Sequence, residues 1–258
     1  MSLTLHKHRV VFKNLNFDRE LDPHRVPAIA SSPYIRQLLD VIDPEEGAQQ
    51  GHRRMVFEWM DTDLWKARPY VFQSLNAVHT DINPNNILLS NLDQPTPTVK
   101  VSDLDQGNLE TRAPEVWYGL GVWPTSDVWS LGVTLVHWLM SKSIFGPRGK
   151  IIKDHTNAWC MAKLMRPVGR FEMSKSMDNY DEWLLAVGLE GTEYRNPEIG
   201  SMKPYITLGI LKEELGQLPR DLCSLECIDF LVYLLNLDYK KRPTTLDALK
   251  HPFVKPAR

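Results

Sequence analysis

The chain has 258 residues, of which 43% are hydrophobic and 24% are charged. These proportions are those of an ordinary globular protein, and they exclude collagen-like, low-complexity and coiled-coil chains. Thirty basic and 32 acidic residues give a net charge of −2. No excess of positive charge therefore points to nucleic acid or to an anionic membrane as a partner.

Short strands are predicted in the first sixty residues. The runs 9–13 and 54–59 are rich in β-branched and aromatic side chains, which is typical of strands. Prolines recur between the two runs, so any helix there must be short. They are Pro23, Pro27 and Pro33. A β-hairpin is predicted further along, where the apolar runs 86–89 and 99–101 flank a turn-rich connector.

The sequence from residue 124 onward predicts mainly helices. Apolar side chains recur at helical spacing within 128–140, and a second apolar stripe lies within 228–235. The pattern of 244–247 fits a capping box that begins a last short helix. The stretch 141–204 has scattered glycine and proline, and we expect an irregular insert with two or three short helices. The predicted fold class is α+β, with a small strand-bearing N-terminal part.

The three cysteines and the apolar stretches bear on the compartment. Cys160, Cys223 and Cys227 do not form the pattern of a secreted disulfide framework, and no further zinc ligands stand near them. We expect buried, unpaired thiols, the last two on one helix face. The N-terminus has no signal-peptide core, and the most apolar stretch, 128–140, is too short to span a bilayer. The sequence predicts an intracellular protein, cytoplasmic or nuclear.

One constellation of oxygen-bearing side chains indicates chemistry. Asp81 and Asn86 stand on either side of Pro84, and a predicted strand follows them. Asp103 comes at the end of the second strand of the predicted hairpin. Carboxylate and amide oxygens brought together in this way can hold Mg²⁺ on a phosphate chain. A further carboxylate, that of Asp81, could accept a proton from a hydroxyl group.

The segment 79–89 resembles the catalytic loop of eukaryotic protein kinases. Further segments follow in the order found in that family. They are 99–105 (the D-F-G region), 111–115 (A-P-E), 126–132 (the start of the buried helix), 238–243 (the late Arg motif) and 248–253 (the closing helix). His-Thr-Asp in place of His-Arg-Asp, together with the insert, is similar to SR-protein kinases and their fungal relatives.

The resemblance implies a two-lobed, protein-kinase-like fold and an ATP-dependent serine/threonine kinase acting on a protein. It implies that Asp81 orients the acceptor hydroxyl and takes its proton, and that Asn86 and Asp103 hold Mg²⁺. Glu115 and Arg242 would form a buried ion pair. The chain would then be one kinase domain over 1–258, with a reduced N-lobe and hinge at 1–60, a C-lobe at 61–258 and an insert at about 141–204.

The N-terminal matches are thinner. Lys13 stands where the family has the lysine that contacts the nucleotide phosphates, although it could equally be a solvated lysine at a strand end. Glu20 resembles the glutamate that pairs with this lysine. It stands only seven positions later, however, which favours the interpretation that Glu20 does not form this pair. Phe57 would lie at the back of the adenine pocket, and the backbone of Glu58 and Met60 would bond the adenine.

Several departures leave activity open. No glycine precedes Lys13, and the 13 residues 66–78 are too few for the two helices expected there. Asn83 replaces the usual lysine, and Asp105 replaces the glycine of D-F-G. A catalytically impaired pseudokinase that binds a protein partner, or an incomplete kinase fragment, therefore remains an alternative. A metal-dependent nuclease or phosphatase would not explain the segment 111–115.

Overall fold

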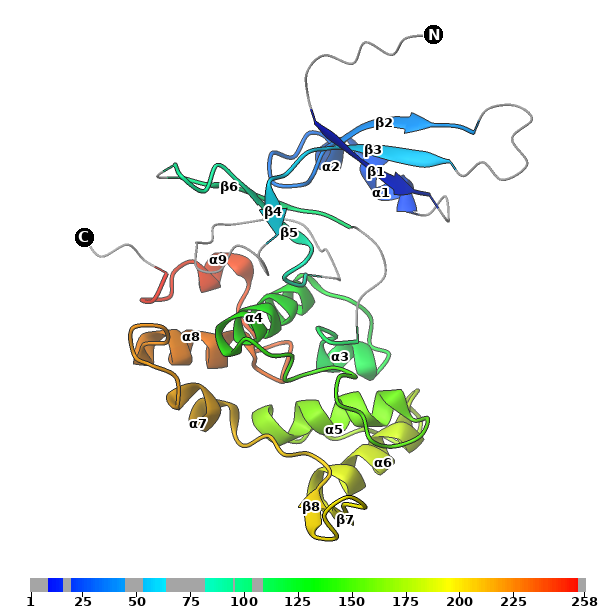
Figure 1. Cartoon of the computed structure of the whole chain (residues 1–258), viewed down its shortest axis with the longest axis vertical. Helices are drawn as coiled ribbons and strands as arrows, with labels where there is room; N and C mark the ends of the chain where they lie inside the picture. Colours follow the sequence, from blue (N-terminus) through cyan, green and yellow to red (C-terminus); the bar gives the residue numbers. More distant parts are fainter. Residues whose placement is uncertain are drawn as a thin grey trace. The chain divides into compact units, whose positions relative to one another are not determined.

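A computed structural model of the chain describes residues 9–15, 20–44, 53–63, 82–94, 96–103 and 109–254. The chain divides into two compact units, Met1–Leu75 with Pro84–Asp105 and Asn76–Asn83 with Gln106–Arg258. The first holds strands and two short helices and the second is mainly helical (Figure 1). This agrees with the predicted α+β class, while the predicted lobe boundary at residue 60 stays a prediction.

The first unit contains a three-stranded antiparallel sheet. Strand β3 (Arg54–Glu58) lies in the centre, between β1 (Val10–Asn14) and β2 (Leu38–Ile42). The sequence predicted β1 and β3 but missed β2. In β2 the pairing with β3 shifts between Leu38 and Asp40, and this irregularity leaves Leu39 exposed. A strand with such a shift lacks the regular alternation by which strands are predicted.

Two four-residue helices, α1 (Asp22–Arg25) and α2 (Pro27–Ala30), connect β1 to β2, as the prolines predicted. One hydrophobic cluster of this unit joins side chains of β3 to side chains of the connection that follows β1. They are Leu15, Leu21, Met55 and Phe57, with Leu38 and Val41 packed against them. Side chains alternate along β1, so that Phe12 is 53% exposed while Lys13 is partly buried.

The predicted hairpin is confirmed as β5 (Ile87–Ser90) and β6 (Thr98–Val101), with β4 (Thr62–Asp63) beside β5. Ile87 pairs with Val101, so Asn86 and Ser102 lie opposite each other where the hairpin opens. The backbone N–H of Ser102 donates to the Asn86 carbonyl at 2.8 Å. The hairpin is also bonded to the segment before β2, because Arg36 N–H donates to the Val101 carbonyl at 2.8 Å.

The second unit is organised around α4 (Pro124–Met140), the helix predicted at 128–140. Trp129, Val133 and Val136 on this helix are at most 1% exposed. Helices α8 (Leu225–Leu234) and α9 (Thr245–Ala248) pack on it. A Cβ at Gly132 would lie 2.9 Å from a methyl carbon of Leu235 and 3.1 Å from the Leu234 Cβ, so a larger residue would require these side chains to shift. Two shorter helices of this unit are α3 (Pro114–Trp117) and α7 (Leu211–Gly216).

Two predicted local features of this unit have different outcomes. The N-cap at Thr244 is confirmed, because its Oγ1 accepts from the Asp247 N–H at 3.2 Å. The prediction that Cys223 and Cys227 lie on one helix face was wrong. Ser224 caps α8, its Oγ accepting from the Cys227 N–H at 3.2 Å, so Cys223 lies before the helix. Both thiols, and that of Cys160, are buried and unpaired, as expected.

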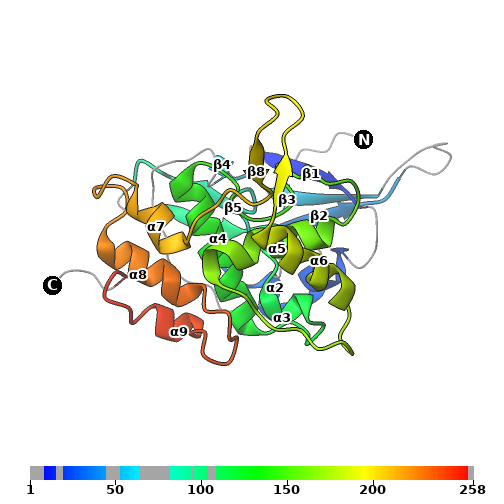
Figure 2. The same ribbon diagram turned by 90° about the horizontal axis from the view of Figure 1, so that it is seen from below.

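The stretch 141–204 is more regular than predicted. It holds α5 (Thr156–Val168), α6 (Tyr180–Gly191) and a hairpin of β7 (Glu193–Arg195) with β8 (Met202–Pro204), which projects in Figure 2. Met161 and Ala162 of α5 are fully buried, so this helix belongs to the core of the unit. Three-residue strands are too short to show a period in the sequence, and the hairpin was missed for that reason. No helix among the described residues is long and apolar enough to cross a membrane.

Candidate active site

The side chain of Lys13 lies between two carboxylates. Its Nζ is 2.6 Å from Asp103 Oδ1 and 3.5 Å from Glu20 Oε2. Burial of Lys13 disfavours its charged form, but the hydrogen bond to Asp103 and the charges of Asp103 and Glu20 outweigh that effect and raise the pKa of Lys13. The ammonium group is therefore charged at neutral pH and lies between the two carboxylates.

Glu20 precedes α1, and only 6% of the residue is exposed. In the sequence, the separation of only seven positions from Lys13 was evidence against an ion pair of Glu20 with Lys13. The structure instead shows that seven positions are enough, because Leu15 and Leu21 both turn into the same core. The sequence did contain a signal for the pair, because segment 19–21 resembles the family's segment with the partner glutamate. The short spacing from Lys13 outweighed that signal.

Asp103 and Asn86 lie at the open end of the β5–β6 hairpin. Asp103 has a backbone φ of 65°, a left-handed conformation that a residue other than glycine adopts at a cost and that recurs at functional sites. Its side chain is 40% exposed, whereas Asn86 is buried. A carboxylate and an amide oxygen at neighbouring positions of a ladder fit the hard oxygen ligands that Mg²⁺ requires, with the remaining ligands coming from phosphate and water. The predicted general base, Asp81, lies outside the described residues.

A cavity of about 80 Å³ opens beside these groups. Phe57, predicted at the back of an adenine pocket, lines it and is 6% exposed. The Phe57 ring meets the His24 ring edge to face, with centroids 5.1 Å apart. Burial and the charge of Lys13 lower the pKa of His24, against the opposing charge of Asp103. The cavity is lined by Lys13, Glu20, His24, Arg36, Met55, Phe57, Ser102 and Asp103.

The backbone of Glu58 is already bonded within the unit. Its N–H donates to the Gln37 carbonyl at 3.1 Å, and its carbonyl accepts from Arg36 Nε at 3.0 Å. The Glu58 carboxylate accepts from Lys100 Nζ at 2.6 and 2.9 Å. Met60, the second residue predicted to bond adenine, is buried beside Ser90, whose hydroxyl lies 3.8 Å from its sulfur.

Sequence reasoning missed Arg36 and Lys100 as partners of Glu58. The guanidinium of Arg36 also lies over the Phe57 ring, 5.3 Å from its centroid. Burial lowers the pKa of Arg36, and the charge of Glu58 opposes this effect. A contact from a side chain to a distant carbonyl leaves no pattern in the sequence. No signal could have identified it.

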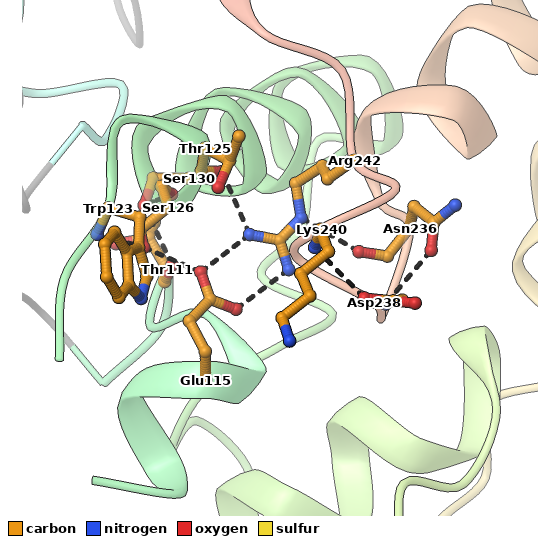
Figure 3. A network of polar contacts seen from close by, with 10 residues as sticks. All are labelled: Thr111, Glu115, Trp123, Thr125, Ser126, Ser130, Asn236, Asp238, Lys240 and Arg242. Atoms are coloured by element: carbon orange, nitrogen blue, oxygen red, sulfur yellow. Dashed lines mark hydrogen bonds and ion pairs between the residues drawn. The ribbon is translucent and has the colours of Figure 1, made fainter. Parts of the chain in front are cut away.

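The predicted ion pair of Glu115 and Arg242 is confirmed in the second unit (Figure 3). The guanidinium bonds both carboxylate oxygens, at 2.8 and 2.9 Å, and neither side chain is exposed to solvent. Arg242 also donates to the carbonyls of Asn236 and Thr125, at 2.8 and 2.9 Å. Ser126 Oγ donates to Glu115 at 2.6 Å. The pair thus ties α3 to the chain before α9 and to the start of α4.

Comparisons with known proteins bear on the family and the fold of the chain. The sequence model of the family described as protein kinase domain matches residues 52–254. Serine/threonine-protein kinase AFC2 of Arabidopsis thaliana is 28% identical over 218 residues, which cover 69% of this chain and 48% of that protein. Dual specificity protein kinase lkh1 of Schizosaccharomyces pombe is 25% identical over 223 residues, which cover 76% of this chain and 31% of that protein.

The chain thus spans half or less of the length of these two relatives. Among solved structures, MAP kinase LmaMPK10 from Leishmania major matches with a TM-score of 0.52 at 20% identity, over 86% of this chain and 64% of that one. At this identity the match concerns the fold alone. It confirms the predicted kinase-like fold class.

Proposed function

Because the chain belongs to the protein kinase domain family, we propose that it transfers the γ-phosphate of ATP to a serine or threonine hydroxyl of a protein. One observation carries this proposal: the ammonium of Lys13 is held between the carboxylates of Asp103 and Glu20 beside a cavity. A cation beside a carboxylate at the edge of a cavity is an arrangement that phosphoryl transfer from a nucleotide uses.

In this proposal each group has one task. Lys13 would bond the phosphates of the nucleotide, and Glu20 would keep its ammonium in place. Asp103 and Asn86 would hold Mg²⁺, which when bound neutralises charge on the phosphoryl group. Asp81 would take the hydroxyl proton as the new O–P bond forms and the bond to the ADP oxygen breaks.

The remaining proposed contacts concern the base and the partner. Phe57 would close the back of the adenine pocket, and the backbone of Glu58 and Met60 would bond adenine. We further propose a protein rather than a nucleic acid as the acceptor, because the chain carries a net charge of −2. The names of the relatives, a serine/threonine kinase and a dual specificity kinase, support a hydroxyl acceptor.

A thermal melt of the purified chain with and without Mg²⁺-ATP tests the nucleotide site. At a hundredfold excess over its Kd, a ligand that binds only the folded state adds about 2.7 kcal/mol to the free energy of unfolding. For a chain of this size we expect a rise in Tm of roughly 5–10 °C. A cooperative melt that Mg²⁺-ATP leaves unchanged would reject the proposed activity.

A second function, a pseudokinase that binds a protein partner, is favoured by the bond between Arg36 and Glu58. The guanidinium takes the carbonyl that adenine would need, and it lines the same small cavity as Lys13. About 80 Å³ is also well below the 300–1,000 Å³ of typical small-molecule sites. Nucleotide binding would therefore require Arg36 to move or to share this acceptor.

Replacing Arg36 with valine should strengthen nucleotide binding. The substitution frees the Glu58 carbonyl from a hydrogen bond to a charged group, which is worth about 1.5–3 kcal/mol, so we expect Mg²⁺-ATP to bind about tenfold or more tightly. Calorimetric titration measures the change. Arg54→Val is the matched control, since Arg54 lies exposed on β3 of the same unit. If both variants bind ATP as the parent chain does, the Glu58 carbonyl is not an adenine contact.

A further inference from the structure

A second cavity, of about 300 Å³, lies within the helical unit. The loop 142–151, helix α5 and the β7–β8 hairpin with the residues up to Leu208 line it. The volume reaches the lower end of the range for small-molecule sites. All of these residues belong to the unit that lacks Lys13 and Asp103, so an inference from this cavity is independent of the proposed kinase activity.

The lining of this cavity is strongly cationic. Lys142, Arg148, Lys163 and Lys203 contribute to it, and its lining residues, all in the described part of the chain, include no aspartate or glutamate. None of the four forms an ion pair with a carboxylate of the described residues. The chain as a whole has a net charge of −2, so this concentration of positive charge is local.

Lys163 is the innermost of these cations and is 7% exposed. Its Nζ donates to the carbonyls of Arg148 at 2.9 Å and Phe145 at 3.4 Å. Burial lowers the pKa of Lys163. Burial and then the charges of Lys163 and Arg148 lower the pKa of His137 to about 3. The charge of Glu110 opposes this effect of burial on Lys163. The hydrogen bonds of the ammonium described here go only to carbonyls, so a bound anion would add a directly bonded counter-charge.

The cavity also has aromatic walls. Trp159 lines it and is 3% exposed, and its indole N–H has no acceptor among the described residues. A buried donor without an acceptor is costly and rare. This nitrogen is itself shielded from solvent, so a ligand in the cavity could bond it only after the indole moves. The rings of Tyr194 and Tyr205 lie 5.0 Å apart on the opposite segment of the lining. Such walls suit an anion that is carried on an organic group.

We propose that this cavity binds the phosphate monoester of a phosphorylated side chain in a protein segment. A phosphate offers three oxygens and close to two negative charges, which match several cations better than one carboxylate does. The cavity is larger than a phosphate alone requires. A lipid headgroup is disfavoured as the source, because membrane attachment draws on a wider basic surface than a chain of net charge −2 offers.

Calorimetric titration of the full chain with N-acetyl-O-phosphoserine amide tests the proposal. We expect saturable binding that Arg148→Gln and Lys203→Gln each weaken about tenfold, since each removes a charged hydrogen bond to the phosphate. Both side chains are exposed, so these variants should melt as the parent chain does. Lys175→Gln removes an exposed lysine outside the cavity and should change the affinity less than twofold.

Three outcomes would overturn the proposal. Equal weakening by Lys175→Gln and Arg148→Gln would show general electrostatic attraction rather than a site. If inorganic phosphate binds as tightly as the phosphoserine compound, the cavity does not recognise the protein segment that carries the phosphate. Binding confined to vesicles that contain phosphorylated inositol lipids would assign the cavity to a membrane headgroup.

Discussion

Replacing Arg242 with leucine should lower the free energy of unfolding of the helical unit by about 3–5 kcal/mol, because removing one partner of a buried ion pair leaves the other charge buried and unpaired. The carboxylate of Glu115 would keep only the Ser126 hydroxyl as a bonded partner among the contacts described above. Arg242 also lies over the Trp129 ring, 5.0 Å from its centroid, so the substitution removes this contact as well. A thermal melt should show a drop in Tm of roughly 10 °C.

The neighbouring lysine is the matched control for this prediction. The Lys241 side chain is 77% exposed and, among the residues that the structure describes, forms an ion pair only with Asp238, at 3.4 Å. Lys241→Leu should therefore change the free energy of unfolding by no more than about 0.5 kcal/mol. Arg242→Leu combined with Glu115→Leu should be less damaging than the two single effects added together, because no unpaired charge remains. Additive single effects would show that the pair is not coupled.

The parts of the site that a sequence could predict are those with fixed chemistry at fixed spacing. Lys13 ends a β-branched run, and Asp103 ends a hairpin whose two strands and turn are visible as apolar runs around a connector. The Glu115 to Arg242 pair spans 127 positions and was still predictable. Both residues belong to motifs that resemble a family, and spacing alone would not have paired them.

What the sequence could not show depends on register and on side-chain paths. The bond from Arg36 to the Glu58 carbonyl joins the segment before β2 to the end of β3, and no residue type announces it. The cationic cavity draws its lysines from positions as far apart as Lys142 and Lys203. Lys163 illustrates the limit, because a lysine within a helix is ordinarily read as solvated, and here it is buried.

Replacing Asp103 with asparagine should reduce phosphoryl transfer by a factor of at least about 10²–10³, the usual cost of losing one preorganised electrostatic contact at a reacting centre. The substitution keeps the shape of the side chain but removes the negative charge that holds Lys13 at 2.6 Å and that would hold Mg²⁺. The Mg²⁺-dependent part of the rise in Tm with ATP should vanish too. Transfer of radiolabelled phosphate to a general protein acceptor measures the first effect, and melts with and without Mg²⁺ measure the second.

The fold itself should survive this substitution. The Asp103 side chain is 40% exposed. Asparagine adopts the left-handed backbone conformation of this position as readily as aspartate does. The melt without ligand should therefore stay within a few degrees of that of the parent chain. Asp93→Asn, in the exposed turn of the same hairpin, is the control for charge and should leave transfer unchanged. Transfer that persists in Asp103→Asn would reject Asp103 as a metal ligand, whereas its loss in both variants would point to the hairpin rather than to the charge.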